Sequence, residues 1–414
     1  MKKSKLTLLM ALFSLALTAQ VTQWRGPNRD GQFPETNLMK TWPESGPELV
    51  LEVEKIGKGY SSPILCDGVI YTSGMIDTLD YLTSINSDGT FNWQIAYGRS
   101  WNNSFPDTRS TPVIEGDRIY VQSGTGRVAC IDKSTGKENW AVEVDKEFEG
   151  QYHIWGNSET PLIVDDLVIC TPGGQKTAVV ALNKLTGDLV WKSESLGGPR
   201  AYASATIYEF NGHRYILAVT AQHLMALNPK TGELAWSYQY FQPDEWTWQP
   251  DGMIWTNTPV FKDNHIFLSM GYNYKAVMLE MDSLGTGVTE KFVDHTFDNH
   301  HHGVILHDGY LYGSNWQDNK RGKWVCMNWN TGEIMYVAKW DTKGSMVFAD
   351  GLLYGYNEKG NVGIIKPDPD GFEVVSQFKV TKGAGPHWAH PYIADGKMLI
   401  RHGDALMVYN IYAQ

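Results

Sequence analysis

A glycine followed four positions later by an aromatic residue recurs along this chain at a nearly constant distance. The phrase begins with Asp-Gly or Thr-Gly and occurs at Gly89/Trp93, Gly136/Trp140, Gly187/Trp191 and Gly232/Trp236, with a weaker copy at Gly332/Tyr336. The first steps between glycines are 47, 51 and 45 residues, and the last step of 100 residues covers two repeats. A period in the forties made of short strands is typical of propeller blades. In such a blade the glycine closes a hairpin at positive φ, and the Trp packs between blades.

A second repeated position marks where each blade begins. A small residue or a His, often followed by Pro, precedes an apolar strand at Ser62, Thr111, Thr160, Ser204, Thr258, His302, Ser345 and His390. These positions are 49, 49, 44, 54, 44, 43 and 45 residues apart. Eight starts predict an all-β protein, an eight-bladed β-propeller of four-stranded antiparallel blades.

The last blade lacks one strand. Only three strands follow Pro391, and no glycine-aromatic phrase follows them. We predict that residues 49–53 supply the missing strand, so that an N-terminal strand in the last blade closes the ring and covers an exposed edge. The predicted organisation is a signal peptide at 1–19, an N-terminal extension at 20–48 and the propeller at 49–414.

The first nineteen residues predict export. Lys2, Lys3 and Lys5 precede an apolar run at 8–17, and Ala19 offers a small residue for cleavage. Because no Cys lies near that position, we expect a periplasmic or secreted protein that is not a lipoprotein and has no membrane span after cleavage. The formal net charge of −11 disfavours nucleic acid as a partner.

The repeats resemble those of a known superfamily. Ala181-Leu182-Asn183 and Ala226-Leu227-Asn228 precede two of the glycine phrases, as in propellers of the pyrroloquinoline-quinone (PQQ) repeat superfamily. Residues 24–31, Trp-Arg-Gly-Pro-Asn-Arg-Asp-Gly, resemble the opening of exported PQQ-like proteins. The superfamily includes quinoprotein alcohol dehydrogenases and non-catalytic propellers such as the barrel-assembly lipoprotein, so the resemblance implies the fold and leaves the activity open.

Two columns of residues at the blade starts differ in how strictly they repeat. The hydroxyl column consists of the eight blade-start residues from Ser62 to His390, of which six are Ser or Thr and two are His. The variable column lies two residues earlier, on the same side of an extended strand, and reads Tyr60, Arg109, Ser158, Tyr202, Thr256, His300, Lys343 and Trp388. Because a repeated structural role would not vary this much, we predict that the variable column lines a ligand site at the mouth of the central channel.

The loops on one face of the predicted propeller are long and unlike one another. They span 98–107, 146–156, 241–253 and 314–322, and they contain Trp101, Trp155, Trp246, Trp248 and Trp316. Such loops on a rigid scaffold often bind ligands, although the same Trp residues could simply cover the core. The predicted ligand-binding residues are Tyr60, Arg109, Trp155, Asn157, Tyr202, Trp255, Asn257, His300, His302, Lys343, Trp388 and His390.

A run of three histidines at 300–302 suggests a metal site. Strand alternation places His300 and His302 on one face and His301 on the other, and His390 joins the first two at the channel. With Glu159 and Asn257, which the PQQ resemblance suggests as Ca²⁺ ligands, the candidate metal ligands are Glu159, Asn257, His300, His302 and His390. The alternative is a polar channel of hydrogen-bonded histidines, since the spacing matches no standard metal signature.

Three functions of different classes are consistent with these residues. The first is a ligand-binding or scaffolding propeller whose long-loop face binds a small molecule, a carbohydrate or a protein partner. The second, implied by the resemblance, is a PQQ- and Ca²⁺-dependent alcohol dehydrogenase, although the chain lacks the adjacent Cys pair and the haem site of many such enzymes. The third is a polysaccharide lyase, for which the candidate catalytic residues are His300, Tyr202 and Tyr60 as bases and Arg109 as the neutralising cation.

Overall fold

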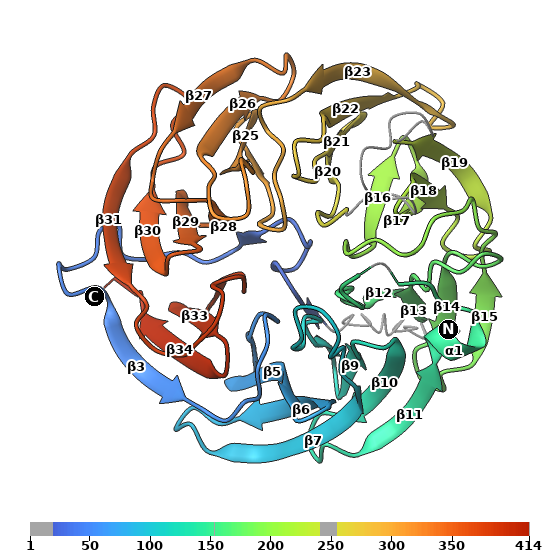
Figure 1. Ribbon diagram of the computed structural model, residues 1–414, viewed down its shortest axis with the longest axis horizontal. Helices are drawn as coiled ribbons and strands as arrows, with labels where there is room; N and C mark the ends of the chain where they lie inside the picture. The colour runs from blue at the N-terminus through green and yellow to red at the C-terminus, as the bar shows by residue number, and fades with distance from the viewer. Residues whose placement is uncertain (1–19, 153, 241–254, 414) are drawn as a thin grey trace, which may run out of the picture.

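Short antiparallel strands follow one another along the whole described chain and form eight sheets in a ring (Figure 1). The computed structural model describes residues 20–152, 154–240 and 255–413. In this part of the chain each sheet contains four consecutive strands, or three plus an N-terminal strand, which confirms the predicted eight-bladed propeller. None of the described helices is long and apolar enough to cross a membrane.

The blades follow the order of the sequence. Blades 1 to 4 consist of β4 (Ile64–Cys66), β5 (Val69–Ile76), β6 (Leu79–Ile85) and β7 (Phe91–Arg99); β8 (Val113–Glu115), β9 (Arg118–Gln122), β10 (Arg127–Asp132) and β11 (Glu138–Glu143); β12 (Leu162–Val164), β13 (Leu167–Cys170), β14 (Val180–Asn183) and β15 (Leu189–Lys192); β16 (Thr206–Phe210), β17 (His213–Val219), β18 (His223–Leu227) and β19 (Leu234–Gln239). A single helical turn, α1 (Val144–Glu147), follows β11.

Blades 5 to 8 repeat this arrangement. They consist of β20 (Val260–Lys262), β21 (His265–Leu268), β22 (Ala276–Met281) and β23 (Val288–Asp294); β24 (Ile305–His307), β25 (Tyr310–Ser314), β26 (Trp324–Asn328) and β27 (Ile334–Ala338); β28 (Gly344–Ala349), β29 (Leu352–Asn357), β30 (Asn361–Ile365) and β31 (Val374–Lys379); β32 (Tyr392–Ala394), β33 (Lys397–His402) and β34 (Ala405–Asn410), with β3 (Glu48–Val53) as the outer strand of blade 8.

The recurring glycine and Trp contact each other across neighbouring blades. Gly187, in the turn between β14 and β15, has φ +79°, and a Cβ there would lie 2.8 Å from the ring of Trp140 in the preceding blade. The indole of Trp140 also donates a hydrogen bond to the carbonyl of Lys184 at 3.1 Å. Glycine is therefore required here for two reasons: the turn needs a positive φ, and a side chain would collide with the Trp140 ring.

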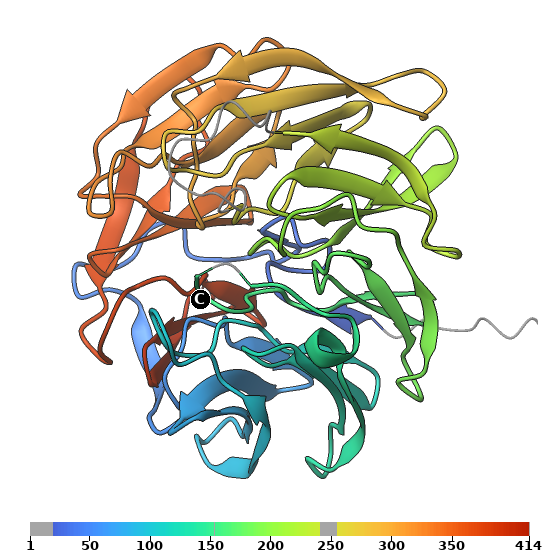
Figure 2. The ribbon, with the colours of Figure 1, turned by 45° about the vertical axis from the view of Figure 1, so that its right-hand side comes forward.

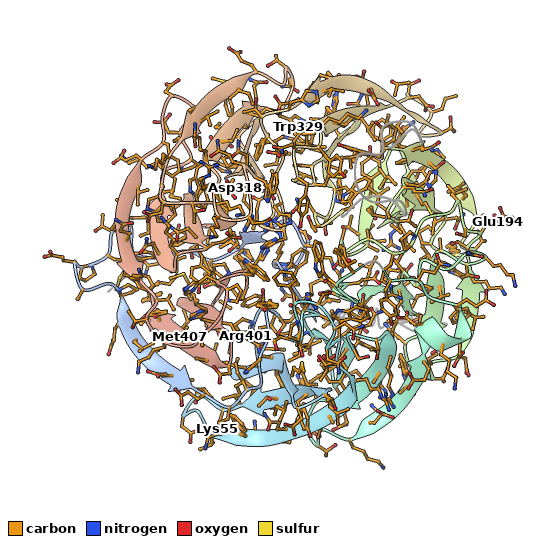
Figure 3. All side chains as sticks on the ribbon, in the orientation of Figure 1. Lys55, Glu194, Asp318, Trp329, Arg401 and Met407 are labelled. Atoms are coloured by element: carbon orange, nitrogen blue, oxygen red, sulfur yellow. The ribbon has the colours of Figure 1, made fainter. Side chains whose placement is uncertain are left out.

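The ring is closed by noncovalent contacts between blades 8 and 1. The predicted strand exchange is confirmed, because β3 pairs antiparallel with β34 from Glu48 to Val53. Arg401 of β33 is fully buried and donates to Ser61 Oγ at 2.6 Å and to the carbonyl of Gly57 at 2.7 Å. Figure 3 shows Arg401 and Met407 inside the side-chain packing, with exposed Lys55 and Glu194 at the outer edge.

The N-terminal segment lies inside the ring. Its strand β1 (Val21–Thr22) adds to β8 in blade 2, and β2 (Gln32–Phe33) adds in parallel to β28 in blade 7, so these two blades have five strands rather than four. Residues 23–31 cross between them as a plug, drawn in dark blue inside the ring in Figures 1 and 2.

Two buried arginines hold the plug in opposite directions. Arg25 donates to the carbonyls of Val304 in blade 6 and Met346 in blade 7, at 3.1 and 3.2 Å. Arg29 donates to the carbonyls of Thr160 in blade 3 and Ala205 in blade 4, at 3.0 and 3.1 Å. Burial lowers the pKa of each arginine to about 10, so both stay charged at neutral pH. The extension predicted at 20–48 thus contributes to the centre of the propeller.

The hydroxyl column connects successive inner strands. The backbone N–H of Ser62 donates to Thr111 Oγ1 at 3.0 Å, and that of Thr111 donates to Thr160 Oγ1 at 3.3 Å. The N–H of Thr160 in turn donates to Ser204 Oγ at 3.0 Å. The hydroxyls of Thr111, Thr160 and Ser204 therefore accept the same inter-blade hydrogen bond. Those of Ser62 and Thr258 instead donate to the carbonyls of His390 and Ser204 in the neighbouring blade.

Candidate functional site

A cavity of about 580 Å³ lies at the mouth of the central channel. All eight residues of the variable column line it: Tyr60, Arg109, Ser158, Tyr202, Thr256, His300, Lys343 and Trp388. Each of these residues lies just before or at the start of an innermost strand, so the ring of blades brings them around one axis. Cavities of this size commonly hold small-molecule ligands.

Aromatic side chains surround this cavity in a closed sequence of ring contacts. We call this set the aromatic collar; it consists of Phe105, Trp155, Tyr272, His300, His301 and Trp388. Neighbouring ring centroids lie between 4.3 and 6.4 Å apart, and the last contact returns from His301 to Trp388 at 5.3 Å. Phe105 is 56% exposed, so it forms the outer rim of the collar.

Arg109 supplies a positive charge within the collar. Its guanidinium donates to the backbone carbonyls of Asp107, at 3.3 Å, and Phe105, and it lies 5.8 Å from the centre of the Tyr60 ring. Burial lowers the pKa of Arg109, but the nearby Tyr60, Tyr202 and Asp107 oppose that shift. Because both of these hydrogen bonds go to neutral carbonyls, the guanidinium can still pair with an anionic ligand.

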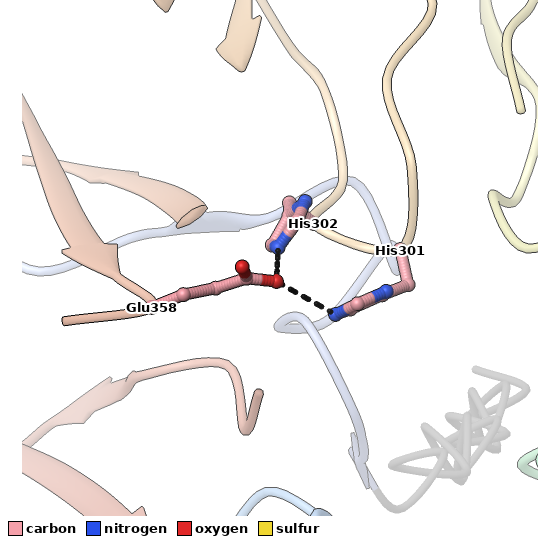
Figure 4. Close-up of side chains that lie close together, drawn as sticks. All are labelled: His301, His302 and Glu358. Carbon is pink, nitrogen blue, oxygen red and sulfur yellow. Dashed lines mark hydrogen bonds and ion pairs between the residues drawn. The ribbon is translucent and has the colours of Figure 1, made fainter. Parts of the chain in front are cut away.

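Glu358 forms the centre of a second polar cluster in the cavity wall (Figure 4). Its Oε1 accepts a hydrogen bond from Trp388 Nε1 at 3.1 Å, and it lies 3.2 Å from His302 Nε2 and 3.8 Å from His301 Nε2. Its Oε2 lies 2.9 Å from the ammonium of Lys343, which is 1% exposed. Lys343 is thus already paired, whereas Arg109 remains available to a ligand.

The histidines around the cavity are neutral. Burial lowers the pKa of His300, His301, His302 and His390 well below the usual range, and neighbouring positive groups add to this effect. Each neutral imidazole therefore has one nitrogen without a proton, which can accept a hydrogen bond or bind a metal ion.

The plug contributes the floor of the cavity. Trp24 and His390 both line the cavity and contact each other edge to face, with centroids 5.2 Å apart. Arg25 donates to His390 Nδ1 at 3.1 Å, so Nε2 carries the proton and donates to the carbonyl of His301 at 2.9 Å. This chain of contacts links the N-terminal segment to the histidine run.

Four predicted ligand-binding residues, Asn157, Trp255, Asn257 and His302, lie outside the cavity lining. His302 lies behind it and contacts Glu358. Trp255 is fully buried in a hydrophobic cluster, and its indole donates to the carbonyl of Asn257. Asn157 donates to the carbonyl of Ser123 and accepts from the N–H of Glu159. These polar side chains satisfy buried backbone groups.

Two of the candidate metal ligands are likewise occupied by the framework. Glu159 is 1% exposed and accepts hydrogen bonds from the N–H and hydroxyl of Thr171, at 2.8 and 2.9 Å. Asn257 donates to the carbonyls of Ser269 and Asn299 and accepts from the N–H of Gly303. Glu159 and Asn257 would therefore have to give up hydrogen bonds of the framework to bind the Ca²⁺ that the PQQ resemblance implies.

The histidine run also differs from its predicted geometry. His301 and His302 form a bend, and β24 begins only at Ile305, so strand alternation does not apply to them. As a result His301 faces Glu358 together with His302, whereas it was predicted to point away (Figure 4). Glu358 was not among the predicted site residues. It follows β29, the second strand of blade 7, on the same face as the long loops, but its own turn is short.

The predicted loop at 241–253, with Trp246 and Trp248, falls on residues 241–254, which lie outside the described residues. The other long loops supply Phe105, Trp155, Asn319 and Lys320 to the cavity lining.

Comparisons with known proteins agree with this architecture. Residues 80–336, more than half of the chain, match the family described as outer membrane protein assembly factor BamB. The chain is 25% identical over 184 residues to BamB of Alkalilimnicola ehrlichii, covering 43% of this chain and 42% of that protein. It is 25% identical over 146 residues to the quinohemoprotein alcohol dehydrogenase ADH-IIG of Pseudomonas putida, covering 33% of this chain and 20% of that protein. These matches span less than half of the length of either relative.

Solved structures share the fold at low sequence identity. A quinohemoprotein alcohol dehydrogenase from Comamonas testosteroni superposes with a TM-score of 0.71 at 13% identity, over 93% of this chain and 79% of that one. BamB from Moraxella catarrhalis superposes with a TM-score of 0.61 at 15% identity, over 88% and 99% of the two chains. At these identities the likeness establishes the fold alone.

Proposed function

The chain belongs to the PQQ-repeat β-propeller family of BamB, and from this premise we propose that it is an exported binding protein that holds a small acidic saccharide in the cavity of its long-loop face. One observation carries the proposal: eight residues that do not repeat from blade to blade line a single cavity. The framework needs the repeated positions, so the divergent ones are free to serve a ligand.

The chemistry of the lining favours a sugar acid. Trp155 and Trp388 offer flat apolar faces of the kind on which sugar rings stack, and they lie at separate points of the aromatic collar. Arg109 lies inside the collar with a guanidinium that can pair with a carboxylate. A neutral sugar would use the first feature and leave the second without a role.

The tyrosines support binding rather than proton abstraction. Burial raises the pKa of Tyr60 and of Tyr202 to about 12, so both phenols stay protonated at neutral pH. A lyase that used either tyrosine as its base would have to ionise it against that shift. A phenol that stays protonated takes part in hydrogen bonds rather than removing a proton, and Tyr60 already donates to Asp107 Oδ2 at 3.5 Å.

The proposal is tested by titration calorimetry of the chain from Gln20 with a tri-galacturonate and with a neutral trisaccharide of the same linkage. We expect the acidic sugar to bind at least about tenfold more tightly, a difference of about 1.4 kcal/mol. Arg109→Met should remove that preference, whereas Arg214→Met, at a 39% exposed side chain in blade 4, should not.

A third titration, with PQQ and Ca²⁺, addresses the dehydrogenase alternative that the family raises. Tight 1:1 binding of PQQ that a saccharide does not displace would replace the proposal with a quinoprotein function. Equal affinity for the acidic and neutral sugars would contradict the role of Arg109.

A further inference from the structure

We propose that His301, His302 and Glu358 form a binding site for a divalent transition metal of the zinc type in the wall of the cavity. The two histidines come from the link between blades 5 and 6, and the carboxylate comes from the turn between β29 and β30 in blade 7. This inference goes beyond saccharide binding, because the metal can be titrated with no saccharide present.

The spacing of the three groups suits such an ion. Their ligand atoms all lie within 4.8 Å of one another, and Glu358 Oε1 is 3.2 Å from His302 Nε2 and 3.8 Å from His301 Nε2. A tetrahedral ion bound at about 2.0 to 2.1 Å separates its ligand atoms by about 3.3 Å. Only small side-chain movements would therefore bring the three atoms to bonding distance.

One ligand atom lacks a partner. His301 Nε2 is buried and has no hydrogen-bond partner among the described residues, although it points at a carboxylate (Figure 4). A bound cation would satisfy the His301 nitrogen and the carboxylate together.

The carboxylate is already held in place. Trp388 Nε1 donates to Oε1 at 3.1 Å, and Lys343 Nζ lies 2.9 Å from Oε2. Such outer contacts orient a metal ligand before the ion arrives. The ammonium of Lys343 also repels a second cation, so its charge weakens metal binding while its hydrogen bond positions the ligand.

The cavity leaves one coordination position accessible. His301 and Glu358 line the cavity, with side chains that are 23% and 12% exposed, whereas His302 is buried behind them. Three protein ligands and an open fourth position are typical of zinc sites that bind water or a substrate oxygen. Imidazole with carboxylate suits Zn²⁺ and Co²⁺, and two nitrogen ligands disfavour Mg²⁺ and Ca²⁺.

The test uses the full chain from Gln20 after treatment with a chelator. Zn²⁺ is titrated by calorimetry, and Co²⁺ is followed by visible absorption, which reports tetrahedral coordination. We expect one ion per chain, and we expect His301→Ala and Glu358→Gln each to weaken binding by more than about tenfold. His295→Ala, at an exposed histidine just after β23, should bind as the wild type does.

Lys343→Met provides a test of opposite sign. Removal of the repelling charge should tighten Zn²⁺ binding by at least about tenfold, while a mere Lys343–Glu358 ion pair would show no gain in metal affinity. If this variant does not fold, His301→Gln, at a partly exposed position, carries the test alone. Absence of stoichiometric Zn²⁺ binding, or binding that His301→Ala and His301→Gln leave unchanged, would overturn the proposal.

Discussion

The hydroxyl column and the variable column lie two residues apart on the same eight chain segments, yet they do opposite things. Ser62, Thr111 and Thr160 each connect one blade to the next through the same hydrogen bond. The variable column makes no such series; its members differ in size, charge and polarity and meet around one cavity. In a repeat protein, recurrence thus identifies the framework, and divergence at an equivalent position identifies the surface that is free to specialise.

The hydroxyl column itself departs from the repeat at two positions, and these exceptions show how the two columns differ. The hydroxyl column has His at blades 6 and 8, and both imidazoles make contacts that no hydroxyl makes elsewhere among the described blades. His302 contacts Glu358, and His390 accepts a hydrogen bond from Arg25 of the plug. These two exceptions connect the framework to the cavity wall and to its floor.

The largest expected effect on stability is that of substituting Arg25, which donates a hydrogen bond to His390, one of the two histidines of the hydroxyl column. Arg25→Met would leave the buried carbonyls of Val304 and Met346, and Nδ1 of His390, without their donor. At about 1 kcal/mol or more for each group, we expect the free energy of unfolding to fall by about 3 kcal/mol or more. Urea denaturation measures it.

Arg214→Met is the control for this substitution. Arg214 makes ion pairs on the surface with Asp165 and Glu209, and such pairs contribute less than about 1 kcal/mol. If both variants lost the same stability, the plug would not be part of the framework.

A smaller effect separates the columns within one blade. Thr160→Val keeps the shape of the side chain but removes the acceptor for the N–H of Thr111, and we expect a loss of about 1 to 3 kcal/mol in unfolding free energy. Ser158→Ala, two residues earlier in the variable column, should change that energy by less than about 0.5 kcal/mol. The comparison would fail if Ser158→Ala were the more damaging change in denaturant titrations.

The smallest effect at neutral pH concerns a residue that belongs to neither column. His387 precedes Trp388 and stacks on His402 with centroids 3.7 Å apart. Burial, and then the neighbouring His402, lower the pKa of His387 to about 4. The unfolded chain therefore takes up the proton first, and stability is lost as the pH falls from about 6.5 towards 4.

His387→Gln removes this titration, so we expect a shallower loss of stability over the same pH range. Unfolding curves recorded at several pH values for both proteins give the two slopes. An unchanged slope would show that the acid sensitivity arises at other groups.

The features of the fold that repeat along the chain could be predicted from the sequence. The number of blades, the strand exchanged between the ends, the glycine-Trp contacts and the two columns all follow from period and alternation, and the structure has them at the expected positions. Apart from the exchanged strand, which follows from the strand that the last blade lacks, each of these features is specified many times over along the chain, so local irregularities do not hide it.

Contacts that occur once were not predictable in the same way. Glu358 meets His302 only because blades 6 and 7 are neighbours, and nothing near Glu358 in the sequence indicates that meeting. Glu159 and Asn257 are polar residues near the channel, but their bonds to Thr171 and Ser269 become visible only when burial is known. Sequence position gives the face on which a residue lies; its partners depend on the assembled ring.

The plug has a consequence for how the chain is made. Residues 21–33 are synthesised before any blade, yet they contact blades 2, 3, 4, 6, 7 and 8. Likewise, β3 cannot pair until β34, which ends at Asn410, has been synthesised. Contacts this distant along the chain form slowly and leave strand edges unpaired in the meantime. Residues 21–33 can therefore reach their final place only after the strands and loops up to His390 have been made. A nascent chain whose blades 7 and 8 have not yet been made, or a truncated chain that lacks them, has unpaired strand edges and is therefore prone to aggregate.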